Sequence, residues 1–190
     1  QLAPGQSLLV RSIPAVKKAI PTEAISKVFT PLVPSTKIQL TFPQSVLPGQ
    51  SMESLQFWTQ DSSTHDYWGK GTYSFDFDLG EEQISSAKVL YFDKIRDWVR
   101  VKINGKDLGL VWSLPYQLAI PAGLLSSQNH IELEVMNVSA NRIRKLDREK
   151  FNWKNFYEIN FVDIQYKPFD ASIWAVTASG IEGELYFSNL

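Results

Sequence analysis

The sequence predicts an all-β fold, an antiparallel β-sandwich, and two observations carry this prediction. Strand signals recur over residues 37–190 at the even spacing that is typical of sandwiches, and no long amphipathic helix interrupts them. The chain has 190 residues, of which 44% are hydrophobic and 13% are aromatic. This is enough apolar material to bury the core of one domain.

The N-terminal quarter of the chain differs in composition from the rest. Prolines recur so often there that we expect no long helix or strand before about residue 50. We interpret residues 1–36 as an extended lead or linker and residues 37–190 as the sandwich. Within the lead, residues 15–20 and 23–29 can form at most one or two helical turns, which are too short to be stable without a partner surface.

A β-hairpin is the clearest local prediction. The apolar residues of 99–103 alternate with Trp98 and two basic residues, as in a half-buried strand. Asn104 and Gly105 then supply the two positive φ angles of a type I′ turn. By strand parity Trp98 lies on the basic face, so it either packs under a neighbouring segment or contacts another domain.

The remaining elements follow from alternation and from apolar runs bounded by turn residues. Residues 142–148 can form a turn or two of helix. The other strands are expected at residues 37–42, 71–77, 87–92, 117–120, 130–135, 163–166 and 183–187.

Charge and cysteine content exclude several classes of function. The formal net charge is -1 and no basic block occurs, so we expect neither nucleic acid nor an anionic membrane surface as a partner. No segment has the length of a membrane span. The absence of cysteine rules out a disulfide framework, a thiolate zinc site and a cysteine nucleophile, and it leaves the redox compartment open.

The sequence predicts no catalytic residues in this chain. His65 and His130 lack the spacing of zinc ligands on one face of a helix, which argues against a zinc hydrolase. Glu132 and Glu134 alternate with apolar residues, so they belong to the solvated face of a strand and not to a glycosidase acid pair. No nucleophile elbow, phosphate-binding loop or calcium-loop pattern is present.

Aromatic residues are abundant in the expected loops, among polar neighbours. Sugars present apolar C–H faces ringed by hydroxyl groups, and a flat aromatic side chain flanked by amides or charged groups suits them. For any single tryptophan, the alternative is that it closes the end of the sandwich core. The aromatic residues concerned are Trp58, Tyr67, Trp68, Trp112, Tyr116, Trp153, Tyr157 and Trp174.

A family resemblance lies in Tyr67–Phe77, Val99–Gly109, Trp112–Tyr116, Ile131–Val135, Asn137 and Asn141–Ile143. These segments resemble the galactose-binding-like, sugar-binding domain of family 2 glycoside hydrolases. The version at the C-terminal end of large bacterial α-L-rhamnosidase-type enzymes is the more similar one. Residues 156–162 and 166–172 resemble the closing segment of the same enzymes, and residues 2–8 resemble the last strand of the domain that precedes it.

The resemblance implies a jelly-roll β-sandwich that belongs to an exported bacterial enzyme, at the cell surface, in the periplasm or secreted. It also implies a role in breaking down plant or other complex polysaccharides, with the catalytic acids in an upstream domain of the same polypeptide. A structural calcium ion is implied as well, although the sequence does not identify its ligands. Leu114 and residues 117–119 depart from the family pattern, which puts a ligand role of that loop in doubt.

The sequence therefore predicts a non-catalytic, carbohydrate-binding ancillary domain. The alternative is a purely structural sandwich that packs against other domains and has no affinity for sugar, and a self-sufficient small hydrolase is disfavoured. If sugar binds, we expect the aromatic residues to act as stacking platforms and the two polar residues to bind hydroxyl groups. The expected site residues are Trp68, Trp112, Tyr116, Asn141, Arg142 and Trp153.

Overall fold

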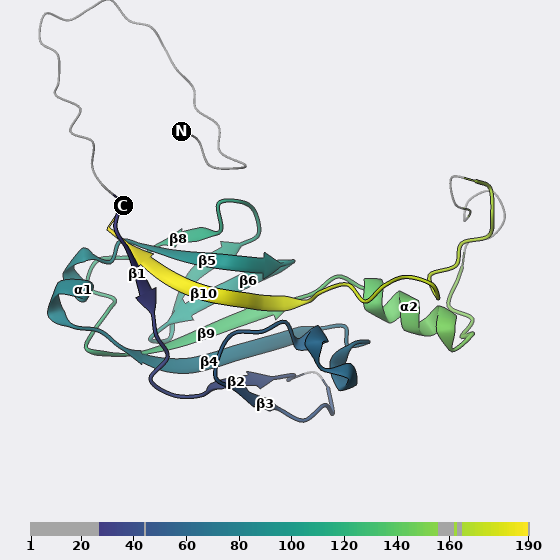
Figure 1. The fold of residues 1–190 in the computed structure, drawn as a ribbon, viewed down its shortest axis with the longest axis horizontal. Helices are drawn as coiled ribbons and strands as arrows, with labels where there is room; N and C mark the ends of the chain where they lie inside the picture. The colour runs from purple at the N-terminus through teal and green to yellow at the C-terminus, as the bar shows by residue number, and fades with distance from the viewer. Residues whose placement is uncertain (1–26, 44, 156–161, 163–164, 190) are drawn as a thin grey trace, which may run out of the picture.

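The computed structural model describes residues 27–43, 45–155, 162 and 165–189. Its strands form two sheets in which all neighbouring strands are antiparallel (Figure 1), which confirms the predicted sandwich. The first sheet has the order β1 (Phe29–Leu32), β10 (Gly180–Ser188), β5 (Val89–Arg96), β8 (Gln117–Ala119). The second has the order β3 (Gln50–Met52), β2 (Ile38–Thr41), β4 (Lys70–Asp78), β9 (Gln128–Met136), β6 (Trp98–Ile103), β7 (Lys106–Val111).

Strands β4 and β9 form the central pair of the six-stranded sheet and are in register from Lys70 opposite Met136 to Asp78 opposite Gln128. Their alternation places one set of side chains in the core and the other in solvent. On the solvent side Glu132 and Glu134 form ion pairs, at 3.7 Å with Lys102 and at 3.2 Å with Lys70. The expected position of these glutamates on the solvated face is confirmed.

The predicted hairpin is present as β6 and β7. Asn104 and Gly105 have φ angles of 52° and 76°, and they connect the paired residues Ile103 and Lys106. The Asn104 side chain also binds outside the hairpin, because its amide donates to the Leu124 carbonyl at 3.0 Å. The hairpin is therefore fixed both by its own turn and by the neighbouring loop.

Two elements differ from expectation at the ends of the chain. Strand β1 pairs with β10, so the sandwich includes residues before 37. Pro31 obscures this strand in the sequence, but it is tolerated because β1 lies at a sheet edge, where a missing N–H costs little. Of the strand expected at 163–166, Gln165 and Tyr166 lie in a turn and bend, and the other two residues lie outside the described part.

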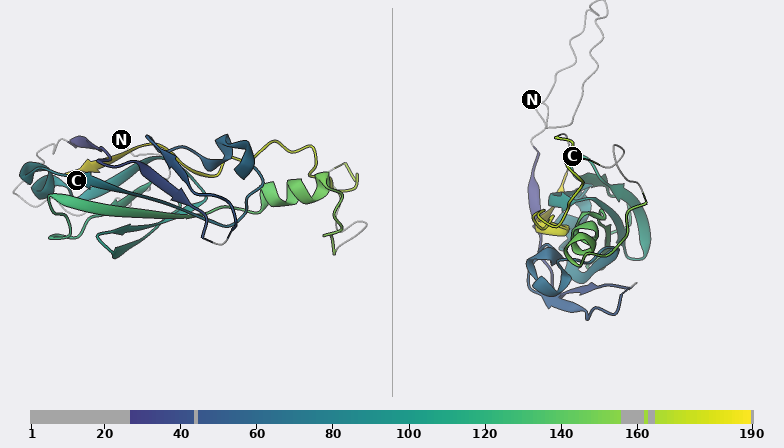
Figure 2. Two further views of the ribbon diagram at one scale, coloured as in Figure 1. Left: turned by 90° about the horizontal axis from the view of Figure 1, so that it is seen from below. Right: turned by 90° about the vertical axis from the view of Figure 1, so that its right-hand side faces the viewer.

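In the part of the chain that the structure describes, two α-helices accompany the sheets. The helix α1 (Glu81–Ser86) connects β4 to β5, and α2 (Ala140–Arg148) confirms the helix expected at 142–148. Helix α2 projects beyond the end of both sheets in two perpendicular views (Figures 1 and 2). The helical turns expected at 15–20 lie outside the described residues, as does most of the segment 23–29. Within the described chain, no helix is long and apolar enough to cross a membrane.

Trp58 closes the core at the end of the sandwich nearest α2. It belongs to a short 3-10 helix (Trp58–Gln60), is 1% exposed, and stacks on Tyr73 with ring centroids 6.4 Å apart. Its ring passes so close to Gly71 that a Cβ there would lie 2.7 Å from a ring carbon. The core interpretation therefore holds for this tryptophan.

We predict that Gly71→Ala destabilises the fold by about 1–3 kcal/mol, because the added methyl group must displace the Trp58 ring from a packed core. Gly49→Ala is the matched control, since a Cβ at Gly49 meets its nearest atom at 3.4 Å. Urea unfolding monitored by circular dichroism measures both variants. Equal stability of the two variants would show that the ring has room to move.

Candidate functional site

A shallow hollow of about 380 Å³ brings two of the expected site residues together. Trp68 lies in the loop before β4, and Arg142 lies in the first turn of α2. Asp66 and Lys145 complete the charged part of the lining, while Ser45 and Ser63 supply hydroxyl groups. The hollow therefore combines an aromatic plane, two basic groups and several hydrogen-bonding groups.

The indole of Trp68 is exposed although its backbone is held in place. Its side chain is 55% exposed. On either side of it the backbone binds the buried amide of Asn137, which donates to the Tyr67 carbonyl at 2.9 Å and accepts from the Gly69 N–H at 3.0 Å. Gly69 has a φ of 142°, where a side chain is disfavoured. The loop thus presents an exposed aromatic ring on a fixed backbone.

The lining of the hollow has more basic than acidic side chains. The Asp66 carboxylate accepts from Arg144 at 3.1 Å, and Arg144 itself also donates to the Trp174 carbonyl at 2.8 Å. Lys145 lies 3.7 Å from Glu149 on the exposed side of α2. Within the part of the chain that the structure describes, Arg142 has no ion-pair partner and its side chain is exposed. The hollow therefore carries a positive excess.

Asn141 does not contact this hollow. Its side chain is 1% exposed, and both ends of its amide bind the backbone of Thr177: Nδ2 donates to the carbonyl and Oδ1 accepts from the N–H, each at 2.8 Å. This amide links α2 to the irregular segment that leads into β10. Its expected role as a ligand of hydroxyl groups is replaced by a structural one, because all its polar atoms are already occupied.

Trp112 and Tyr116 lie in the connection between β7 and β8 and do not line the hollow. Trp112 is 71% exposed, whereas Tyr116 packs partly against the core and its carbonyl accepts from the Phe92 N–H at 2.9 Å. These two expected site residues therefore belong to another part of the surface.

Trp153 lies in the segment between α2 and β10, which we call the arm. It belongs to a small cluster, the arm cluster, formed by Asp147, Trp153, Lys154, Phe169 and Ala171. The Asp147 carboxylate accepts from the Trp153 indole at 2.7 Å and from the Ala171 N–H at 2.7 Å, and it forms an ion pair with Lys154 at 3.2 Å. The Trp153 ring packs edge-on against Phe169. Desolvation by burial opposes ionisation, but these donors together hold the pKa of Asp147 below its usual value.

Among the charged residues of the hollow, sequence reasoning missed Lys145. Lys145 follows Arg142 by three residues, and positions i and i+3 share one face of a helix. The helix was expected, so this spacing was the signal that could have found Lys145. Asp66 lies in the polar loop beside Tyr67 and Trp68, which marks it as a residue near a ligand, but only the structure shows its contact with Arg144 of α2.

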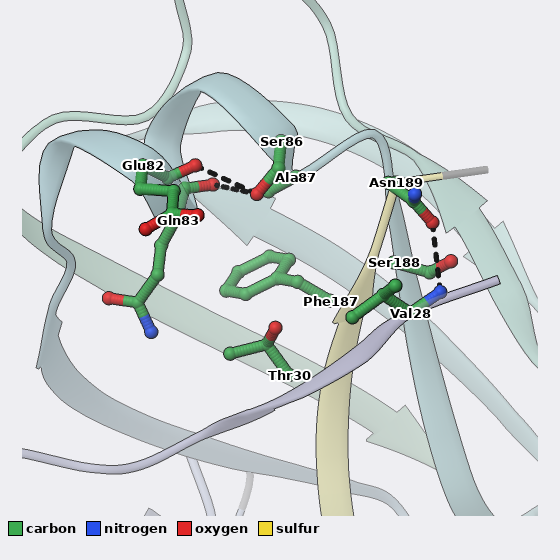
Figure 3. A pocket seen from close by; sticks show the side chains of 9 residues that line it. All are labelled: Val28, Thr30, Glu82, Gln83, Ser86, Ala87, Phe187, Ser188 and Asn189. Atoms are coloured by element: carbon green, nitrogen blue, oxygen red, sulfur yellow. Dashed lines mark hydrogen bonds between the residues drawn. The ribbon is translucent and has the colours of Figure 1, made fainter. Parts of the chain in front are cut away.

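A second hollow of about 390 Å³ lies at the opposite end of β10, between α1 and β1 (Figure 3). Phe187 lies beneath it but is only 3% exposed, so it offers no open aromatic face. Several polar groups of this hollow already bind within the protein: the Ser86 hydroxyl donates to the Glu82 carbonyl, and the Val28 N–H donates to the Asn189 side chain. This hollow is the weaker candidate for a ligand site.

We assign no ligands to the calcium ion that the family resemblance implies. Among the residues that the structure describes, no three His, Cys, Asp or Glu side chains come together in a group that could hold a metal ion. Acidic side chains are the usual charged ligands of calcium, and the described residues do not bring enough of them together to form a carboxylate-rich site.

Comparison with solved structures supports the fold. A rhamnosidase from Novosphingobium sp. PP1Y matches 90% of this chain with a TM-score of 0.67 and 20% identity, over 16% of its own chain. A family 2 β-galacturonidase from Eisenbergiella tayi matches 86% at a TM-score of 0.51 and 14% identity, over 24% of its chain. A β-glucuronidase from Bacteroides uniformis matches 86% at 0.52 and 14% identity, over 18% of its chain.

The structural neighbours are thus family 2 and rhamnosidase-type glycoside hydrolases, which confirms the resemblance at the level of fold. This chain corresponds to less than a quarter of the length of each. No protein-family model and no curated protein sequence matches the chain.

We predict that substitutions at two adjacent residues change stability by very different amounts. Asn141→Ala removes the two hydrogen bonds that the buried Asn141 amide makes with the Thr177 backbone, and it costs about 1–3 kcal/mol. Arg142→Ala changes the free energy of unfolding by less than about 0.5 kcal/mol, because the side chain is exposed. Chemical denaturation of the two variants checks this, and comparable losses would contradict the assignment of Asn141 to the structural frame.

We predict that the arm cluster loosens in acid. The pKa of Asp147 is lowered in the folded protein, so its stabilising effect is complete above the usual pKa of about 4 and is lost as pH falls through the lower folded value. Asp147→Asn reproduces this loosening at neutral pH, seen as faster amide hydrogen exchange at Ala171. Glu149→Gln, one half-turn along, is the control. Unchanged exchange in Asp147→Asn would show that the cluster does not depend on this carboxylate.

Proposed function

We propose that this chain is a non-catalytic ancillary domain of a larger glycoside hydrolase and that it binds carbohydrate in the hollow beside Trp68. The observation that carries the proposal is the exposed indole, held on a fixed backbone and facing a hollow lined by charged and hydroxyl side chains. The shared fold with glycoside hydrolases supports the same conclusion. In this proposal the upstream catalytic domain belongs to the same polypeptide.

The chemistry of the hollow suits a sugar. The indole provides a flat apolar surface for the C–H face of a pyranose ring, and the serine and charged groups can bind its hydroxyl groups. Because the hollow is shallow and open, a ligand buries only part of its surface there, which predicts weak binding. Weak binding suits a domain that keeps an enzyme close to a polymer with many identical sites.

The arrangement of the carboxyl groups in the described part of this chain supports a catalytic site elsewhere in the polypeptide. A glycosidase needs two carboxyl groups that flank the bond and differ in pKa. Among the described carboxyl groups, a raised pKa is found at Asp97, where burial is the cause. Asp97 lies between β5 and β6 and does not line the hollow, whereas Glu132 and Glu134 are paired with lysines.

The proposal extends to location. A domain that holds a glycoside hydrolase on a polysaccharide acts where the polymer is, outside the cytoplasm. We therefore propose a bacterial, exported parent protein, in the periplasm, at the cell surface or secreted. The absence of cysteine is compatible with this location because the fold needs no disulfide.

A second candidate function is interdomain packing without affinity for sugar. The arm beyond α2 exposes large apolar side chains outside the sandwich core, and exposed apolar groups of this kind often mark protein contacts. These residues are Phe151, Tyr166, Ile173 and Trp174. The two candidates use different surfaces, so a binding experiment distinguishes them.

We predict that the chain binds pectic oligosaccharides weakly and that Trp68→Ala lowers the affinity about tenfold, which corresponds to losing about 1.4 kcal/mol of stacking. Isothermal titration calorimetry measures the change. Trp112→Ala is the control, because its indole is exposed but lies outside the hollow. Absence of binding by the unmodified chain would reject the sugar site and favour interdomain packing.

A further inference from the structure

We infer that the hollow beside Trp68 selects acidic sugars, in which a ring carries a carboxylate, over neutral sugars. This inference rests on the proposed function, because it specifies the class of ligand at the same site. Three features carry it: the charge balance of the lining, the placement of two basic side chains on one face of α2, and the aromatic plane beside them.

The charge balance comes from an ion pair that already uses the acidic group of the lining. Asp66 is bound by Arg144, whose guanidinium is mostly buried and is also held by the Trp174 carbonyl. This pairing leaves Asp66 little capacity to repel an anion. The two other charged groups of the lining are Arg142 and Lys145, and both are basic.

The two basic groups are spaced to share one carboxylate. Residues three apart on a helix have Cβ atoms about 5–6 Å apart on the same face. Arg142 has no ion-pair partner among the described residues, and its guanidinium can bind both oxygens of a carboxylate at once. Lys145 has a partner in Glu149, but that pair is long, exposed and weak, so a ligand carboxylate can compete with it.

The aromatic plane separates an acidic sugar from other anions. Trp68 offers stacking surface next to the basic groups, and this surface benefits only a ligand with an apolar ring face. A free carboxylate or phosphate would use the charges and leave the indole unused. A neutral sugar would use the indole and leave Arg142 without a partner. A uronate ring uses both.

The test compares trigalacturonate with its fully methyl-esterified form, which has the same rings without the charges. We expect the acid to bind about fivefold more tightly at about 20 mM salt, and the ratio to fall below about twofold at 0.5 M salt because exposed ion pairs are screened. Arg142→Gln should remove the preference, so that the acid and the ester bind with equal affinity. Arg148→Gln, on the same helix but outside the hollow, should retain the preference.

The outcomes separate this inference from the proposed function. Equal binding of the acid and the ester would overturn the selectivity while the sugar site stands. Absence of binding by both would overturn the proposed function and the inference together. Sodium acetate that displaces the acid at equal concentration would show that the hollow recognises a carboxylate without its ring, which also overturns the inference. Loss of the preference in Arg148→Gln would place the selecting charge elsewhere on α2.

Discussion

Two buried asparagine side chains, Asn137 and Asn141, hold together the end of the sandwich that carries helix α2 and the hollow beside Trp68. The arrangement of this surface depends on them. Strands β4 and β10 begin there and β9 ends there, so the pairing of β4 with β9 and of β10 with β5 also stops at this end. Asn137 binds the loop before β4 and also the Ser179 hydroxyl, and Asn141 binds the irregular segment that leads into β10. Buried amides stabilise a fold only when their polar atoms have partners, and here the loops supply those partners.

In this arrangement the backbone around Trp68 is fixed although its side chain is exposed. The Asn137 amide fixes the backbone around Trp68, so the indole stays exposed without the conformational freedom that a loop residue normally has. A ligand that stacks on it therefore orders less of the protein when it binds. The arm cluster is organised in a different way, around the single carboxylate of Asp147, and its order depends on charge.

The sequence allowed the β-sandwich, the hairpin and helix α2 to be predicted because each has a periodic or turn signal. Strand β1 was not predictable, since Pro31 marks it as irregular and only its edge position explains the pairing. For the hollow, residue type pointed to Trp68 and Arg142, which the structure brings together, and their role in binding stays a prediction. Asn141 was misjudged because residue type does not reveal burial, and two adjacent residues of one helix turn here have opposite environments.

The edges of both sheets share a property that bears on solubility. Strand β1 carries Pro31, strands β3 and β8 have three residues each, and the pairing of β7 is shifted in register near Val101. Each of these features discourages another strand from adding to the edge. The sheet edges therefore oppose strand pairing between two molecules, and any association must use side chains such as those of the arm.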